Sequence, residues 1–187
     1  MAEIQKIFPT IGCCGIDCGL CPRFYTKGDS QCPGCGGDNF YGKHPACGLL
    51  TCCTAKKGLE VCSECNDYPC SRFESEKEEY DSFVTHKKIF ENLDYIKSKG
   101  IEQFIENQRF RIETLNNLLL NYDEGRSKGF YCISCALLPL HKLNEINEFA
   151  QNMSQDLDLK EESKSLKVFI TSIADSLDID LKLRKRN

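Results

Sequence analysis

The second half of the chain carries apolar residues at the spacing of amphipathic helices. From residue 76 onward they recur three or four positions apart, which places them on one face of a helix. The pattern predicts four helices, over residues 80–99, 101–119, 131–153 and 159–177. We expect Gly100 to end the first helix as a C-cap, and Pro139 to bend the third or delay its start. Such stripes are typical of the core of a small helical bundle.

The first half lacks this periodicity and is dominated by cysteine. The chain of 187 residues has 14 cysteines and no tryptophan, and 12 of the cysteines lie between Cys13 and Cys70. A segment with so few apolar side chains needs a disulfide framework or bound metal to hold it. The first ten residues show no cationic region followed by an apolar one, the mark of a secreted protein. We therefore expect a cytoplasmic protein whose reduced thiols bind metal.

Most of these cysteines fall into four spaced groups. They read C-x3-C-x2-C from Cys14, C-x2-C from Cys32, C-x4-C from Cys47 and C-x2-C-x4-C from Cys62. In C-x2-C, the two intervening residues form a tight turn that directs both sulfurs at one ion. A glycine after the second cysteine suits the positive φ that such a turn often needs. The spacing predicts ten metal ligands: Cys14, Cys18, Cys21, Cys32, Cys35, Cys47, Cys52, Cys62, Cys65 and Cys70.

The spacing leaves open how these ligands share metal. Two tetrahedral sites need eight ligands, and adding Cys132 and Cys135 to the ten would fill three sites. Two of the ten could instead be free, or one site could be a multi-metal cluster. We favour a compact unit resembling a zinc ribbon, with the two cysteine triads sharing or dividing the remaining metal. That unit would contain Cys32, Cys35, Cys47 and Cys52.

Four cysteines stand outside the spaced groups. Cys13 and Cys53 each adjoin a better-placed cysteine, and sequence neighbours cannot easily both reach one tetrahedral centre. We therefore do not expect them to bind metal. Cys132 and Cys135 lie three residues apart on a predicted helix. They could be a third metal-binding pair, a redox dithiol or small core residues. We favour the core interpretation, which is common for cysteine.

The cysteine block resembles a known family, DUF3795, over residues 12–73. The resemblance rests on Cys14-Gly15-Ile16-Asp17-Cys18, Cys32-Pro33-Gly34-Cys35, the Cys47 to Cys52 pair, Lys57-Gly58-Leu59, and the run from Cys62 through Tyr68-Pro69-Cys70. It implies a small prokaryotic, cysteine-rich, metal-binding protein. The family brings no established activity, so whether the protein is an enzyme stays open.

The ligand set favours structural zinc as the cofactor. The protein is then expected to have a partner-binding or accessory role, and the sequence shows no identifiable catalytic site. The alternative is a 4Fe–4S cluster in a redox or electron-transfer protein, or in an accessory to an oxidoreductase, because three close cysteines and a distant fourth commonly hold such clusters. C-x3-C-x2-C also occurs in radical S-adenosylmethionine enzymes. Those enzymes need a β/α barrel, and the chain has no βαβα alternation from which to build one.

We expect the remaining polar residues that could bind metal or act in catalysis to have structural roles instead. We expect His44 to lie in a surface loop, and His86 and His141 to be exposed on helices. Asp17, between two cysteines, could act as a general base but more commonly caps a turn. The basic tail 182–186 is expected to be solvated and mobile.

Net charge and hydropathy exclude two classes of partner. The formal net charge is -4 and the pI about 5.5, so nucleic-acid binding is not expected. No apolar run approaches the roughly 20 residues of a membrane span, so no membrane contact is expected. An unknown protein partner is possible. The sequence thus predicts an α-rich fold: an irregular, metal-stapled, cysteine-rich module over residues 10–75, packed on a small helical bundle over residues 76–180.

Overall fold

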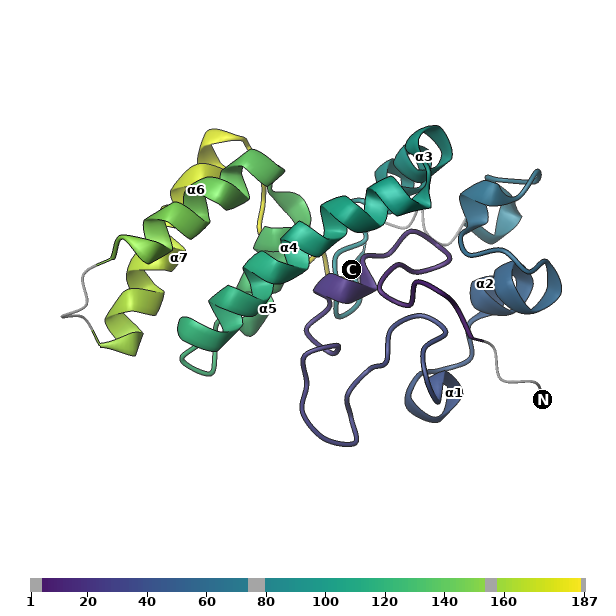
Figure 1. Ribbon diagram of the computed structural model, residues 1–187, viewed down its shortest axis with the longest axis horizontal. Coiled ribbons are helices and arrows are strands. Elements are labelled where there is room, and N and C mark those ends of the chain that lie inside the picture. Colours follow the sequence, from purple (N-terminus) through teal and green to yellow (C-terminus); the bar gives the residue numbers. More distant parts are fainter. Residues whose placement is uncertain (1–4, 74–79, 154–157, 186–187) are drawn as a thin grey trace. The chain divides into compact units, whose positions relative to one another are not determined.

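A computed structural model describes residues 5–73, 80–153 and 158–185 of the chain. Within these ranges the protein is helical and has no strand, and the cysteine-rich region packs on helices, so the predicted fold class is confirmed (Figure 1). The chain forms two compact units. Unit 1 comprises residues 1–106 and 183–187, and unit 2 comprises residues 107–182. No described helix is both long and apolar enough to cross a membrane.

Unit 1 consists mainly of turns and short helical pieces. Its 3-10 turns are η1 (Cys18–Leu20), η3 (Cys62–Glu64) and η4 (Ser71–Phe73). Its other elements are the short helices α1 (Phe40–Lys43) and α2 (Gly48–Leu50), the π-helical turn η2 (Thr51–Lys56), and the longer helix α3 (Ile89–Lys99). None of the pieces before α3 is long enough to be stable alone, so packing must hold them.

Helix α3 supplies the apolar core that the cysteine block lacks. Ile89 and Leu93 of α3 are at most 1% exposed and share one cluster with Ile11, Leu50 and Val61 of the block. The loop around Gly15 lies against the first turn of α3, where a Cβ would come within 2.5 Å of the Ile89 carbonyl oxygen. Asn92 then donates to the Gly15 carbonyl at 2.9 Å. The packing unit therefore extends past residue 75, the predicted module boundary, to residue 106.

The first predicted long helix begins later than its apolar pattern suggests. Residues 80–88 are not helical, and α3 begins at Ile89 rather than near Tyr80. The cause is Asp81, whose carboxylate accepts from the backbone N–H of His86 at 2.7 Å and of Arg184 at 2.8 Å. A short carboxylate that captures backbone donors competes with helix formation. Gly100 ends α3 with φ +90, as predicted.

Unit 2 contains the remaining helices. They are α4 (Ile101–Asn121), which contributes its first residues to unit 1, α5 (Lys128–Leu137), α6 (Leu140–Gln151) and α7 (Leu159–Ser176). The predictions for 101–119 and 159–177 are confirmed to within two residues. Asp158 caps α7 by accepting from the Glu161 N–H at 2.8 Å.

The single helix predicted over 131–153 is wrong, because the chain forms two helices there. Leu138 is extended, with φ -73 and ψ 146, as expected of a residue before proline, and Pro139 starts α6. The guanidinium of Arg111 holds this break by donating to the carbonyls of Cys135 at 2.6 Å and Leu138 at 2.7 Å.

Candidate functional site

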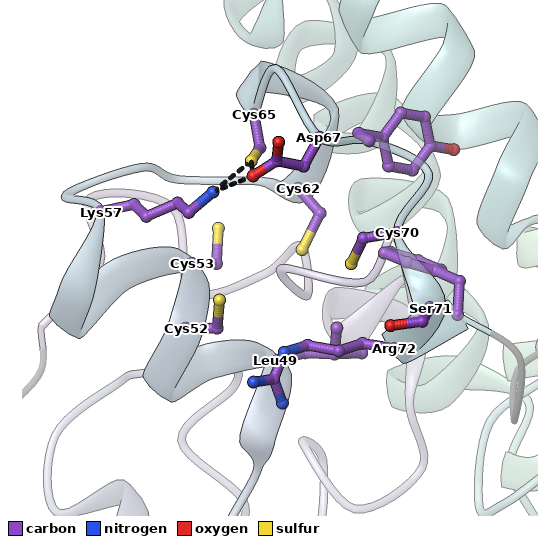
Figure 2. A pocket seen from close by; sticks show the side chains of 12 residues that line it. Leu49, Cys52, Cys53, Lys57, Cys62, Cys65, Asp67, Cys70, Ser71 and Arg72 are labelled. Atoms are coloured by element: carbon purple, nitrogen blue, oxygen red, sulfur yellow. Dashed lines mark hydrogen bonds and ion pairs between the residues drawn. The ribbon is translucent and has the colours of Figure 1, made fainter.

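A cavity of about 280 Å³ in unit 1 brings cysteines from distant parts of the sequence together (Figure 2). Five thiols line it: Cys52, Cys53, Cys62, Cys65 and Cys70. Cys52 and Cys53 lie on the π-helical turn η2, and the other three lie on or after η3. In Figure 2, Cys52 and Cys53 lie on one side of the cavity, and Cys62 and Cys70 lie on the other.

The cysteines from η3 are positioned by a tight C-x2-C turn. The Cys65 N–H donates to the Cys62 carbonyl at 3.0 Å, which closes the turn. The Glu64 carboxylate accepts from the N–H groups of Glu60 at 2.9 Å and Val61 at 3.2 Å, fixing the chain as it enters. The predicted geometry of this motif, two sulfurs on one small turn, is therefore present for Cys62 and Cys65.

Lys57 places a positive charge at the rim of the cavity. Its ammonium donates to the Cys65 sulfur at 2.9 Å and to the Asp67 carboxylate at 2.7 Å (Figure 2). Hydrogen bonds to Asp67 and Cys65 raise the pKa of Lys57, and the ammonium in turn lowers the pKa of Asp67.

A second group of thiols lies beside the first. The pKa of Cys13 is influenced by the thiols of Cys35 and Cys53, and that of Cys53 in turn by Cys62 of the cavity. The charge of Cys18 interacts with that of Cys35, and the Cys13 sulfur lies 3.3 Å from the Thr54 hydroxyl. The thiols of Cys35, Cys13, Cys53 and Cys62 therefore form a continuous row.

Burial and interactions with neighbouring thiols raise the pKa of three cysteines of this row, Cys13, Cys35 and Cys53. The hydrogen bond from Cys35 opposes the shift at Cys13, but that with Cys53, together with burial, raises the pKa of Cys13 to about 11. At Cys53 the bond from Cys13 lowers the pKa, while the bond with Cys62 and burial raise it to about 12. The pKa of Cys35 is raised by its bond to Cys13 and by burial.

A buried lysine lies among these thiols. Lys6 is 4% exposed, and its ammonium donates to the Ile11 carbonyl at 2.6 Å. Its positive charge opposes the rise in pKa of four thiols: Cys13, Cys18, Cys35 and Cys53. No sequence pattern marks this residue, because an isolated lysine in a polar segment is expected to be exposed.

The structure does not group the ten predicted ligands as the favoured zinc ribbon-like unit requires. Cys52 lines the cavity, Cys35 contacts Cys13, and Cys32 lies near Cys21. Cys47 does not line the cavity, and its sulfur accepts from the Leu50 N–H at 3.5 Å. The remaining members are Cys62, Cys65 and Cys70, which line the cavity, and Cys14 and Cys18, whose charges interact with each other.

The described residues contain no group of three or more His, Cys, Asp or Glu side chains already placed to hold a metal ion. They also contain no disulfide, and they include all 14 cysteines. The sulfurs of Cys13 and Cys53 instead contact the Thr54 hydroxyl at 3.3 Å and the Leu59 carbonyl at 3.5 Å. Metal binding would therefore require cysteine side chains to rotate from this row toward a common point.

The histidines and Asp17 lie away from the cavity lining. His44 is exposed and stacks on Phe40 with ring centroids 4.6 Å apart, which confirms the surface expectation. His141 is exposed on α6, also as predicted, but His86 lies in the turn before α3 and contacts the Ser82 hydroxyl at 3.0 Å. Asp17 is 8% exposed and does not cap η1 with its side chain.

Two further expectations concern unit 2 and the tail. Cys132 and Cys135 are 2% and 0% exposed on α5, so the core interpretation is confirmed. The tail expectation is wrong at Arg184, which is held by Asp81 through a guanidinium contact of 2.8 Å. Arg186 and residues 76–79 lie outside the described residues.

Residues 10–75 match the model of a family described as "Protein of unknown function (DUF3795)". The resemblance seen in the sequence is therefore confirmed over the cysteine block. The matched segment includes Cys13 and Cys53 and excludes Lys6 and helix α3. No curated protein and no solved structure matches the chain.

Proposed function

We propose that this protein binds zinc through the thiolates of the cavity in unit 1, as a structural centre of a cytoplasmic protein with a partner-binding or accessory role. The observation that carries the proposal is the convergence of Cys52, Cys62, Cys65 and Cys70 on one cavity. Four thiolates are a common ligand set for structural zinc, and a closed set leaves no open position for hydrolytic chemistry. The proposed centre therefore stabilises the fold and does not act on a substrate.

The surroundings of the cavity suit a negatively charged metal–thiolate group. Four thiolates and one Zn²⁺ carry two net negative charges. The ammonium of Lys57 contacts Cys65, and Arg72 also lines the cavity. Cations that donate hydrogen bonds to a metal-bound sulfur reduce its negative charge and fix its orientation. Such residues strengthen metal binding without contacting the metal themselves.

Metal analysis with a matched cysteine variant tests the proposal. The full chain, purified without oxygen, should contain zinc, and Cys62→Ser should lose about one zinc per chain because serine is a poor ligand near neutral pH. Cys132→Ser is the control, because it removes a buried cysteine of unit 2 that does not line the cavity. Equal zinc content in the two variants would contradict the proposal.

Removal of zinc should unfold the cysteine-rich part while helical signal persists. Binding of structural zinc contributes about 10–16 kcal/mol of apparent free energy in small zinc domains, which exceeds the stability of most domains. The helices α5, α6 and α7 belong to unit 2, whose core contains no part of the cavity lining. Circular dichroism before and after a strong chelator should show partial loss of helicity, and an unchanged melting curve after proven metal loss would contradict the expectation.

The size of the cavity favours a second candidate, a 4Fe–4S cluster in a redox protein. Its volume of about 280 Å³ is many times the ~30 Å³ occupied by one water molecule, so it could accept a group larger than one ion. Tyr68 and Phe73 give it an apolar wall, and burial of this kind tunes the potential of such clusters. A brown colour with broad visible absorption would support this candidate, whereas zinc thiolates are colourless.

A further inference from the structure

We propose that the cavity of unit 1 is a site of thiol–disulfide exchange with a small anionic disulfide, in which Cys65 reacts first and Cys62 then forms a disulfide with it. The inference rests on the proposed function in one respect, because these two thiols are also proposed zinc ligands. It gives the cavity a redox reaction that competes with metal binding. Three features carry it: the turn that joins the two cysteines, their unequal exposure, and the cations of the lining.

The turn η3 holds Cys62 and Cys65 at a separation that a disulfide can span. The Cys65 N–H donates to the Cys62 carbonyl at 3.0 Å, and the Tyr68 N–H donates to the Cys65 carbonyl at 3.0 Å. A turn closed by such a bond between its first and fourth residues brings their Cα atoms within about 7 Å. Disulfides join Cα atoms that are about 4.4–6.8 Å apart. Oxidation of this pair is therefore compatible with the fold of the turn.

The two sulfurs differ in their access to solvent. Cys62 is 8% exposed and belongs to the apolar cluster of unit 1, whereas Cys65 is half-buried. Asp67 lies beside Cys65 at the rim of the cavity, and its side chain is 73% exposed, so this rim is open to solvent. A reagent from solution therefore meets Cys65 first. Cys62, shielded but held in the same turn, is placed to react next.

Two cations favour a reagent that carries negative charge. The Lys57 ammonium lies 2.9 Å from the Cys65 sulfur, where the reaction begins, and Arg72 also lines the cavity. Asp67 pairs with Lys57 at 2.7 Å, so these three side chains together keep one net positive charge. Arginine presents parallel N–H donors that match the two oxygens of a carboxylate. The substrate class is therefore a small disulfide that bears carboxylates, of a size to enter a cavity of about 280 Å³.

The reaction consists of two balanced exchanges. The Cys65 sulfur attacks one sulfur of the reagent RS–SR, whose S–S bond breaks; a mixed disulfide forms at Cys65, and RSH leaves with the proton of the Cys65 thiol. The Cys62 sulfur then attacks the Cys65 sulfur, forms the Cys62–Cys65 disulfide and releases the second RSH with its own proton. The protein dithiol loses two electrons and the reagent gains them. Oxidation removes two of the four proposed zinc ligands, so it and zinc binding exclude each other.

Disulfide mapping of the full-length protein, purified without oxygen, tests the pair. The protein is treated with one equivalent of dithiodiglycolate, a small dianionic disulfide; its remaining thiols are alkylated, and crosslinks are located by mass spectrometry. The first crosslink should join Cys62 and Cys65, with release of zinc in step. Cys132→Ser should give the same map, because Cys132 is buried in unit 2. No crosslink, or a first crosslink between other cysteines, would overturn the inference. Protein that holds no zinc but forms this crosslink would overturn the proposed function alone.

The charge of the reagent tests the role of Arg72. Rates of crosslinking by dithiodiglycolate are compared with those by cystamine, a dicationic disulfide of similar size. Arg72→Gln should lower the ratio of the anionic to the cationic rate about 3- to 5-fold, the effect of one partly screened charge. Lys43→Gln removes the same charge from an exposed position outside the cavity lining and should keep the wild-type ratio. Equal ratios in the two variants would overturn the anionic substrate class.

Discussion

The contact between Asp81 and Arg184 makes a quantitative prediction about stability. The Asp81 side chain is 0% exposed, and its carboxylate accepts from the guanidinium and the N–H of Arg184, both at 2.8 Å. It also accepts from the His86 N–H at 2.7 Å, one turn before α3. Asp81→Ala would leave the Arg184 charge and two backbone donors without this partner.

The expected cost follows from that geometry. Arg184 is 28% exposed and can be hydrated once Asp81 is removed, so the cost is that of lost hydrogen bonds to a buried carboxylate, about 1–3 kcal/mol, compared with a total stability of about 5–15 kcal/mol for a typical domain. With a urea dependence of about 2 kcal/mol per molar, the unfolding midpoint should fall by about 0.5–1.5 M. Urea unfolding followed by circular dichroism measures this shift. Asp94→Ala, at an exposed position of α3, is the control and should change stability by at most ~0.5 kcal/mol.

The pH dependence gives an independent check. Burial raises the pKa of Asp81, but the hydrogen bonds from Arg184 and His86 outweigh it, so the pKa lies below its usual value of 3.8. A depressed folded-state pKa contributes stability above the unfolded pKa and loses it as the pH falls through the folded pKa. Wild type should therefore lose stability below pH 3.8, more steeply than Asp81→Ala. A midpoint shift below about 0.3 M, or identical acid profiles, would refute the reasoning.

Three further predictions follow from single contacts. The hydrogen bond from Ser127, opposed by desolvation, lowers the pKa of Glu124 to about 2 from its usual 4.5. The wild type should therefore lose stability as the pH falls from 4.5 to about 2, and Glu124→Gln should lose less over this range, as measured by urea unfolding at each pH. Gly15→Ala should destabilise unit 1, because its φ is +92 and a Cβ would lie 2.5 Å from the Ile89 carbonyl oxygen; an unchanged melting temperature would contradict this. Lys57→Met should speed alkylation of Cys65 in the zinc-loaded protein, because the sulfur loses its ammonium donor at 2.9 Å, and mass spectrometry of the labelled thiol measures the rate.

Periodicity predicted the parts of the fold that local sequence determines. The helices over 101–119 and 159–177 and the end of α3 at Gly100 follow from apolar spacing and a positive φ, which need no distant partner. The start of α3 does not, because Asp81 is drawn out of the helix by Arg184, about a hundred residues away in sequence. Apolar spacing at Tyr80 could not reveal that competition. Leu138, extended before Pro139, shows a proline that ends one helix and begins another.

The cysteine spacing predicted local turns more readily than contacts between distant motifs. A C-x2-C turn forms from four neighbouring residues, so Cys62 and Cys65 could be recognised as a unit. Pairing between motifs depends on how loops without their own secondary structure pack on α3, which spacing does not encode. The row from Cys35 through Cys13 to Cys53 joins one spaced motif to two cysteines that stand outside the motifs, and its neighbour Lys6 also comes from outside them. A buried cation beside buried thiols has no recognisable sequence pattern, because the sequence does not show which side chains are buried. Only the structure reveals that Lys6 and these thiols are buried together.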